Sequence, residues 1–286
     1  MRAAVAPYSS IFVNGMGGWA PLVVAVAVFG TVLNVRAENV RADGVLSHCG
    51  ADAMAAGRVV RVIDGRSFVL DDGREIRLSS IEVPATTEDA GTDAQAALAA
   101  MVQGDDVALR GTSGGYDRYG RIIAFVSSLI PSSDRRHSGS IAHAMLAKGH
   151  ARVAAHVDTP TCVEELRSEE RAARFDKMGL WGRPQYAIIQ ASNLEGLLAE
   201  RGRFALVEGK VLSVRESGNT IYANFGRRWS QALTVTISKR QERIFADSGL
   251  RPKDLENRRI RVRGWVEVRG GPRIQASRPE QIEFVD

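Results

Sequence analysis

The sequence is poor in cysteine. Only two of its 286 residues are cysteines, Cys49 and Cys162, and two cysteines cannot by themselves supply the ligands of a structural zinc site. The histidines from His137 to His156 lie six or seven residues apart along the chain, and that spacing does not fit a zinc site either. The residues that most often hold zinc are therefore too few or too widely spaced to predict such a site.

Lysine is scarce too. It accounts for 5 of the 38 basic residues, and the others are arginines. Guanidinium groups fit phosphate oxygens better than ammonium groups do, although a GC-rich genome gives the same bias. Hydrophobic residues make up 44% of the chain and charged residues 25%, which excludes long-range disorder and collagen-like or low-complexity architectures. The length favours two domains.

The positive charge is concentrated towards the C-terminus. The net charge is +5 overall. Residues 1–200 hold 20 basic and 23 acidic residues, whereas residues 201–286 hold 18 basic and 10 acidic ones. An excess of cations in one part of a chain is typical of a surface that meets anions. A basic binding surface is therefore expected in the C-terminal third.

One long apolar run lies near the N-terminus. Residues 21–35 carry no charge, and Val35 and Ala37 place apolar or small residues at the −3 and −1 positions of a cut after Ala37. A basic start, a short apolar run and a small-residue exit predict an export signal. An uncleaved membrane anchor over residues 16–37 is the alternative, and Met16 is a second candidate start. Both interpretations put the rest of the chain outside the cytoplasm, in the periplasm or secreted.

Export bears on the two cysteines. In an oxidising compartment a pair of cysteines usually forms a bridge. We therefore predict a disulfide between Cys49 and Cys162, which would tie the segment before the first strand to the last long helix of the first unit. The alternative is two unrelated thiols, buried or free.

Alternating apolar residues and turn signals predict a first strand-rich unit from residue 57. Its strands are expected at 58–63, 67–70, 75–81, 107–110 and 122–129, and its helices at 93–103, 141–148 and 162–178. The last of these helices carries alternating acids and arginines, which is typical of a solvated face.

A second strand-rich unit is predicted from residue 204. Its strands are expected at 206–214, 220–225, 232–238, 259–268 and 273–276, with a helix at 240–246 and a terminal strand at 282–285. Three strands, a helix and two strands form the order of a five-stranded OB barrel, and both units have it. We predict a mainly β fold with capping helices (α+β), in which one OB-fold barrel is followed by a second, OB-like barrel.

These elements divide the chain into five segments. Residues 1–37 form the export signal or anchor and 38–56 a linker. Residues 57–184 form the first domain, 185–202 a helical linker and 203–286 the C-terminal domain.

The residues that could carry chemistry in the first unit are mostly basic. Arg77 and Arg121 fall on predicted strands of one barrel. Two guanidiniums that converge on one phosphate would neutralise the charge that develops when a phosphodiester is cleaved. Tyr119 could stack on a base or donate to a phosphate. The alternative is that both arginines are exposed strand residues paired with nearby acids.

Four segments in order resemble the thermonuclease (SNase-like) family: GRVVRVIDGRSFVLDDGREIRLSSIEVP, DRYGRIIAFV, AHAMLAKGHARV and CVEELRSEERAARFDKMGLW. The resemblance covers about residues 57–183. It implies an OB barrel with capping helices and, in active members, hydrolysis of DNA or RNA with calcium. It also implies that Arg77 and Arg121 bind the scissile phosphate, that Arg118 and Tyr119 contact the nucleotide, and that Asp64 and Glu82 are metal ligands.

The same resemblance exposes three departures from the family pattern. Arg66 stands where the family has its second acid, usually a calcium ligand, and Val83 replaces a residue that offers an oxygen. Ala85 stands at the position of the general base, and a methyl group cannot take a proton from water. The nearby Glu88 or Asp89 could replace that base. A calcium ion is coordinated by six to eight oxygen atoms, so we expect this site to bind calcium weakly at most.

Aromatic residues accompany cations in the second unit. Tyr222, Arg227, Arg228 and Trp229 form the candidate nucleic-acid surface, and Phe225, Arg261 and Arg263 belong to the same set. Aromatics among cations on an OB barrel are typical of binding to single-stranded DNA or RNA. The alternative is barrel core beside a solvated edge, because OB folds also serve as protein–protein modules.

Two functions remain open. The first is an exported phosphodiesterase or nuclease with relocated catalytic groups. The second is a non-catalytic module, either one that binds nucleic acid or an envelope scaffold, with membrane contact if the N-terminal segment stays uncleaved. Arg66 and Ala85 favour the second, whereas Arg77 together with Arg121 keeps the first open.

Overall fold

The computed structural model describes residues 53–129, 140–157 and 160–285. The predicted export signal and most of the following linker lie outside these residues, as does Cys49. No helix in the described ranges is long and apolar enough to cross a membrane.

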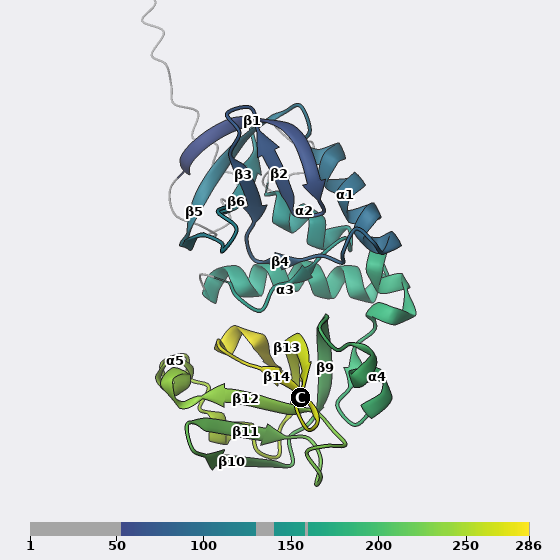
Figure 1. Ribbon diagram of the computed structural model, residues 1–286, viewed down its shortest axis with the longest axis vertical. Helices are drawn as coiled ribbons and strands as arrows, with labels where there is room; N and C mark the ends of the chain where they lie inside the picture. The colour runs from purple at the N-terminus through teal and green to yellow at the C-terminus, as the bar shows by residue number, and fades with distance from the viewer. Residues whose placement is uncertain (1–52, 130–139, 158–159, 286) are drawn as a thin grey trace, which may run out of the picture. The chain divides into compact units, whose positions relative to one another are not determined.

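The first unit is a closed barrel of five strands (Figure 1). The strand order around the barrel is β1-β2-β3-β6-β5. The bounds are β1 Ala53–Asp64, β2 Ser67–Leu70, β3 Glu75–Leu78, β5 Asp106–Tyr116 and β6 Ile122–Ser128. Alternate residues of β2 and β3, among them Phe68, Leu70 and Ile76, are buried in the barrel core, as the period of two of a strand dictates.

Three helices and a small second sheet surround this barrel. The helices are α1 (Asp89–Val102), α2 (Ile141–Ala147) and α3 (Pro160–Phe175). The short strands β4 (Ile81–Glu82) and β7 (Arg152–Val153) pair with each other. Gly65, in the β1–β2 turn, allows α1 to approach closely, because a Cβ atom there would lie 2.6 Å from the Cβ of Ala94.

The predicted bounds of several strands were wrong, and so was the position of one arginine: the first strand begins at Ala53, and the strand expected at 75–81 is divided into β3 and β4. β5 runs to Tyr116, well past the predicted end at residue 110, because its pairing with β6 resumes beyond an irregularity, with Tyr116 opposite Ile122. Arg121 therefore lies in the β5–β6 hairpin turn, one residue before β6, and not on a strand.

The second unit repeats this order in a sheet that does not close. Its strand order is β10-β11-β12-β14-β13-β9-β8, and β15 also pairs with β13. The bounds are β8 Ile189–Gln190, β9 Phe204–Lys210, β10 Ser213–Ser217, β11 Thr220–Asn224, β12 Thr234–Ser238, β13 Arg259–Val268, β14 Pro272–Gln275 and β15 Ile282–Phe284. The predicted helix is present as α5 (Glu242–Asp247).

The second, barrel-like sheet stays open because its predicted first strand, 206–214, is broken. Val211 donates its backbone N–H to Arg258, next to β13, and Leu212 donates to Asn224 on β11. The chain thus changes partners between β9 and β10, and these two segments become separate strands of an open sheet. Taken together as one strand, they restore the order of the first barrel.

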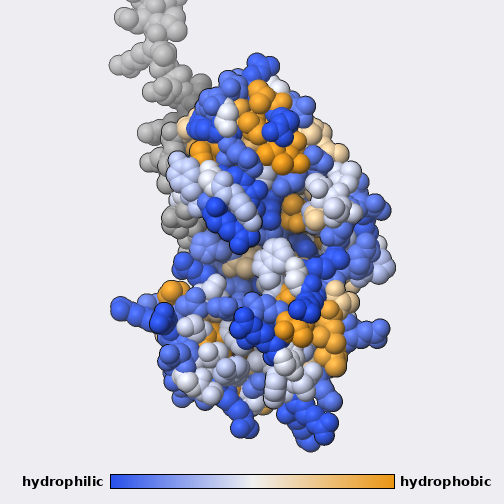
Figure 2. All heavy atoms as spheres, in the orientation of Figure 1, coloured by the Kyte–Doolittle hydropathy of each residue, from blue (hydrophilic) through white to orange (hydrophobic). Residues whose placement is uncertain are grey.

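The predicted helical linker is mostly not helical. Only α4 (Leu194–Ala199) is an α-helix in residues 185–202, and the side chain of Asn193 caps it by accepting from the backbone N–H of Gly196. The preceding β8 instead pairs in parallel with β9. In Figure 2 the larger orange areas lie over the first barrel and near α4, and hydrophilic residues cover most of this face.

A buried ion pair joins α3 to β13. Arg263 and Glu170 each have side chains 1% exposed, and Arg263 Nη2 lies 2.9 Å from Glu170 Oε2. Glu283 also pairs with Arg263, and Arg263 Nη1 donates to the carbonyl of Val153. The predictions of a solvated face for all the charges of the last helix and of a ligand surface containing Arg263 were therefore wrong, because tertiary packing buries these groups against each other.

Candidate phosphate-binding site

The barrel brings Arg77 and Arg121 to the same region. Arg77 lies on β3, which pairs in parallel with β6 so that Ile76 is opposite Ile122. Because Arg121 directly precedes β6, it lies beside the pair of strands that carries Arg77. Their side chains are only 23% and 15% exposed. Both guanidiniums are thus partly withdrawn from water, where charge–charge interactions are stronger than in bulk solvent.

Asp117 holds Arg121 in position. One carboxylate oxygen of Asp117 lies 2.7 Å from both Nε and Nη2 of Arg121. The other oxygen accepts from the backbone N–H of Tyr119 and of Arg121. Burial acts to raise the pKa of Asp117, but these hydrogen bonds hold it below its ordinary value. Our sequence analysis did not identify Asp117 as a functional residue, although an Asp that begins a Gly-containing turn is typical of this bonding.

Tyr119 is exposed and its ring lies close to two guanidiniums. Its side chain is 67% exposed. The guanidinium carbon of Arg118 lies 4.8 Å from the ring centroid, and that of Arg121 lies 5.2 Å from it. Arg118 Nη2 also donates to the Tyr119 hydroxyl at 2.6 Å. The hairpin turn therefore presents a ring and two cations together, as a stacked base with a neighbouring phosphate requires.

Arg66 binds both of the carboxylates that were predicted to be metal ligands. Its backbone N–H donates to Asp64 Oδ1 at 2.8 Å, and its guanidinium pairs with Glu82 Oε2. Arg77 Nη2 lies 3.7 Å from the other oxygen of Glu82. Glu82 is thus shared by two guanidiniums. Among the described residues, no group of three His, Cys, Asp or Glu side chains could hold a metal ion.

The charges of this region shift the pKa of Arg77. Burial lowers it from its ordinary value, and the charges of Arg66 and Arg121 lower it further, whereas Glu82 opposes them. Glu75 adds a more distant carboxylate, 3.9 Å from Arg121. Counted with Arg118, four guanidiniums meet the four carboxylates of Asp64, Glu75, Glu82 and Asp117. The formal charges therefore balance, and an anion would have to bind through the guanidinium N–H groups that the carboxylates leave free.

Glu88 and Asp89, the two candidates for a relocated base, lie in different surroundings. Ala85, at the position of the family's general base, is exposed. The carboxylate of Glu88 accepts from the Tyr186 hydroxyl at 2.7 Å and pairs with Arg203. Burial and this hydrogen bond raise the pKa of Tyr186 to about 12, so the phenol keeps its proton. Glu88 is thus committed to the segment that leads to the second sheet. Asp89 is exposed in the first turn of α1.

The comparisons with known proteins bear on this barrel. Residues 75–183 match the model of the staphylococcal nuclease homologue family. The chain carries an SNase domain. This family is nuclease-type or nucleic-acid-binding, and the resemblance noted in the sequence is confirmed over these residues. A search of the curated proteins found no match to this chain. The closed barrel extends beyond the matched segment, because β1 and β2 precede residue 75.

The remaining predicted residues lie elsewhere. Tyr222 and Trp229 line a common pocket on the second sheet, Arg227 and Arg228 are exposed beside it, and Phe225 is buried in the core. Cys162 is buried and is not a free thiol. Its predicted partner, Cys49, lies outside the described residues, so the bridge stays a prediction.

Proposed function

We propose that the SNase domain binds the phosphodiester backbone of nucleic acid without calcium-dependent hydrolysis. The ion pair between Arg66 and Glu82 carries this proposal. A guanidinium already neutralises the carboxylate that a calcium ion would need. For calcium to bind at Glu82, the ion would have to displace a cation from a partly buried partner and then lie beside it.

The donor set does not fit calcium. The ion takes six to eight oxygen ligands, whereas Asp64 and Glu82 are each engaged by Arg66 and Val83 has no side-chain oxygen. Hydrolysis also needs a group that accepts a proton from water. Ala85 cannot do so, and Glu88 is held by Tyr186 and Arg203. We therefore derive no hydrolytic step at this site.

The same geometry supports binding. Arg121, oriented by Asp117, offers the part of its guanidinium that the carboxylate does not occupy, and Arg77 offers a second guanidinium from the neighbouring strand. Hydrogen bonds between a guanidinium and a phosphate are charge-assisted and are about twice as strong as neutral ones. Tyr119 can stack on an adjacent base while Arg118 meets the next phosphate. Affinity should therefore fall as salt concentration rises.

The test is a binding and cleavage assay on the purified chain. Fluorescence anisotropy with labelled DNA and RNA strands is measured with a chelator and with millimolar calcium, and the same samples are run on a denaturing gel. We expect equal affinity under both conditions, intact strands, and weaker binding by Arg77→Gln and Arg121→Gln. Arg243→Gln, on an exposed residue of α5, is the matched control.

Two alternatives are outcomes of that test. Calcium-dependent cleavage that Arg121→Gln abolishes would indicate a phosphodiesterase with relocated catalytic groups. Cleavage that persists in Arg121→Gln would indicate a contaminating enzyme. A folded chain that binds no strand at low salt would leave a non-catalytic envelope scaffold, with membrane contact if its N-terminal segment is retained, as the better interpretation.

The proposed site of action is outside the cytoplasm. The apolar residues 21–35 and the small residue Ala37 support an export signal or anchor. Mass spectrometry of the protein from the expressing cell should find a mature start near Glu38. A cytoplasmic protein that begins at Met1 or Met16 would contradict export, and the expected bridge between Cys49 and Cys162 would lose its basis.

A further inference from the structure

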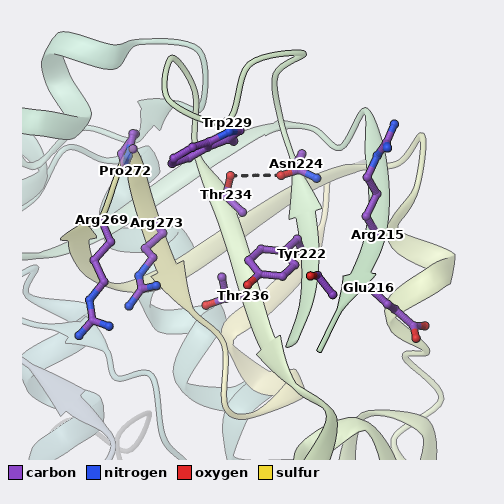
Figure 3. A pocket seen from close by; sticks show the side chains of 12 residues that line it. Arg215, Glu216, Tyr222, Asn224, Trp229, Thr234, Thr236, Arg269, Pro272 and Arg273 are labelled. Atoms are coloured by element: carbon purple, nitrogen blue, oxygen red, sulfur yellow. Dashed lines mark hydrogen bonds between the residues drawn. The ribbon is translucent and has the colours of Figure 1, made fainter. Parts of the chain in front are cut away.

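A pocket of about 490 Å³ lies on the second sheet, away from the SNase site (Figure 3). Its floor is formed by side chains of the neighbouring strands β11 and β12, and its sides by β10, β14 and two loops. A second hollow, of about 690 Å³, shares Arg215, Asn224 and Trp229 with it and continues to Arg227. The two hollows therefore form one continuous surface that is longer than either hollow alone.

Trp229 forms one wall of the pocket and is 59% exposed. Its ring packs against the β13–β14 turn, where Gly270 has φ +70° and a Cβ atom would lie 2.2 Å from Cζ3 of the indole. At Gly271 a Cβ atom would lie 2.3 Å from the Trp229 carbonyl oxygen. Only a glycine pair allows this approach. The turn therefore supports the indole from one side and leaves the remainder of its surface open.

The floor of the pocket is polar. Tyr222 is paired across the strands with Thr236, and Asn224 with Thr234. Thr234 Oγ1 donates to Asn224 Oδ1 at 3.3 Å (Figure 3). The hydroxyls of Tyr222 and Thr236 have no hydrogen-bond partner among the residues that the structure describes. A floor of hydroxyl and amide groups can bond the edge of a flat polar ring, which an apolar floor cannot.

Unpaired arginines flank this pocket. Arg215 and Arg269 line it, and within the described ranges neither side chain has an ion-pair or hydrogen-bond partner. The same holds for Arg227 in the adjoining hollow. The other charged groups are neutralised, since Arg273 binds Glu267 and Glu216 binds Lys239. The available charge is thus positive, on both sides of an aromatic wall.

We propose that this pocket binds one base of a single-stranded nucleic acid. The base stacks on Trp229 with its edge toward Tyr222 and the threonines, and the flanking phosphates meet Arg215, Arg269 and Arg227. The strand must be single because a base paired in a duplex exposes no face to a side chain. Stacking together with phosphate contacts is how proteins hold such strands without strong sequence preference. The pocket goes beyond the proposed function, because it is a second contact on another sheet and does not require the first.

The test separates the two sites by using the full chain with the first one disabled. In an Arg77→Gln/Arg121→Gln background, a short bromodeoxyuridine strand is crosslinked by light and the tryptic peptides are identified by mass spectrometry. We expect crosslinks in peptides 216–227 and 229–239, which carry Tyr222 and Trp229. Trp229→Leu should weaken binding roughly 5- to 150-fold, the range that one stacked base contributes, while Trp229→Phe should retain most of the affinity.

The arginines are tested through salt. Arg215→Gln/Arg269→Gln should reduce the slope of log affinity against log salt by about 1.4, since each phosphate on a single strand contributes about 0.7. Arg243→Gln, an exposed control outside the pocket, should not change the slope. Circular dichroism and the melting temperature confirm that each variant is folded.

The outcomes distinguish this proposal from the first one. If Arg77→Gln/Arg121→Gln alone abolishes all binding, the pocket proposal is wrong and the SNase site is retained. If that double variant binds like the unmodified chain, the SNase site is not used and the pocket proposal stands. If Trp229→Leu and the unmodified chain bind equally, or the crosslinks fall only in the first barrel, the pocket does not hold a base.

Discussion

The two strand-rich regions have the same strand order but differ in whether the arginines of their candidate sites have partners. In the SNase barrel each arginine of the site is fixed by a carboxylate or a ring, as Arg121 is by Asp117. On the second sheet Arg215, Arg227 and Arg269 have no such partner in the described part of the chain. Fixed guanidiniums lose little conformational entropy on binding. Unpaired ones on exposed strands and loops can adapt to a flexible strand. On our two proposals, the same strand order would carry a preorganised phosphate site in one region and an adaptable binding surface in the other.

Breaking the buried ion pair between α3 and β13 should have the largest effect on stability. Glu170→Ala would leave Arg263 buried without its main partner, and breaking such a pair costs about 3–5 kcal/mol. We expect the free energy of unfolding to fall by that amount in urea unfolding followed by circular dichroism. Arg243→Ala, on an exposed pair, should change it by less than about 1 kcal/mol. Equal effects of the two changes would indicate that the α3–β13 contact does not stabilise the chain.

The metal preference of the SNase barrel can be changed by restoring acids. The unmodified chain should show no calcium site tighter than millimolar by calorimetry. Arg66→Asp/Ala85→Glu removes the competing cation and adds carboxylate oxygens, so it should bind calcium more tightly by at least an order of magnitude, as expected for hard oxygen ligands. A micromolar calcium site at Asp64 and Glu82 in the unmodified chain would contradict our interpretation of Arg66.

Substitutions of Arg121 and Asp117 measure how much the fixed orientation of Arg121 contributes to strand binding. Arg121→Gln should weaken strand binding by about 10- to 150-fold, because a hydrogen bond to a charged group contributes roughly 1.5–3 kcal/mol. Asp117→Asn keeps Arg121 but loosens its orientation, so a smaller loss is expected. Arg215→Gln on the second sheet should cost less than Arg121→Gln. Anisotropy titrations of the three folded variants check this order, and the reverse order would contradict the comparison.

Acid should lower the stability of both regions. The contribution of each carboxylate should be smaller than the effects described above. Burial acts to raise the pKa of Glu208, but hydrogen bonds from Arg261 and Arg259 hold it below its ordinary value, and bonds from Arg121 and the turn backbone do the same for Asp117. Because the unfolded chain takes up these protons first, the stabilisation is present above the ordinary carboxyl pKa values. It is lost as pH falls through the lowered ones.

Melting curves between neutral pH and pH 3 test this dependence. Glu208→Gln should flatten the decline of the melting temperature in acid relative to the unmodified chain. Glu195→Gln, on α4 and outside these pairs, is the matched control. A decline that Glu208→Gln leaves unchanged would show that other carboxylates cause it.

Much of the SNase barrel was open to prediction because its signals are local. The turn residues and the alternating apolar residues mark β1, β2, β3 and β6, and the motif residues Arg77, Arg118, Tyr119 and Arg121 lie on or near one hairpin and one strand. That the second sheet stays open was not predictable, because it depends on where Val211 and Leu212 exchange hydrogen-bond partners. The two partners, Asn224 on β11 and Arg258 beside β13, are brought to this point by packing and not by a local pattern.

The sequence alone determined the repeated strand order, the basic C-terminal third and the loss of acids at positions 66 and 85. Only the tertiary structure decided what those residues do. Arg66 meets Glu82 sixteen residues away, Glu88 meets Arg203, and Trp229 rests on the Gly270 turn. Turn residues and the alternation of apolar residues along a strand are local signals that a sequence displays directly. A charge or a ring acquires its role from groups brought to it by packing, and no local pattern contains that information.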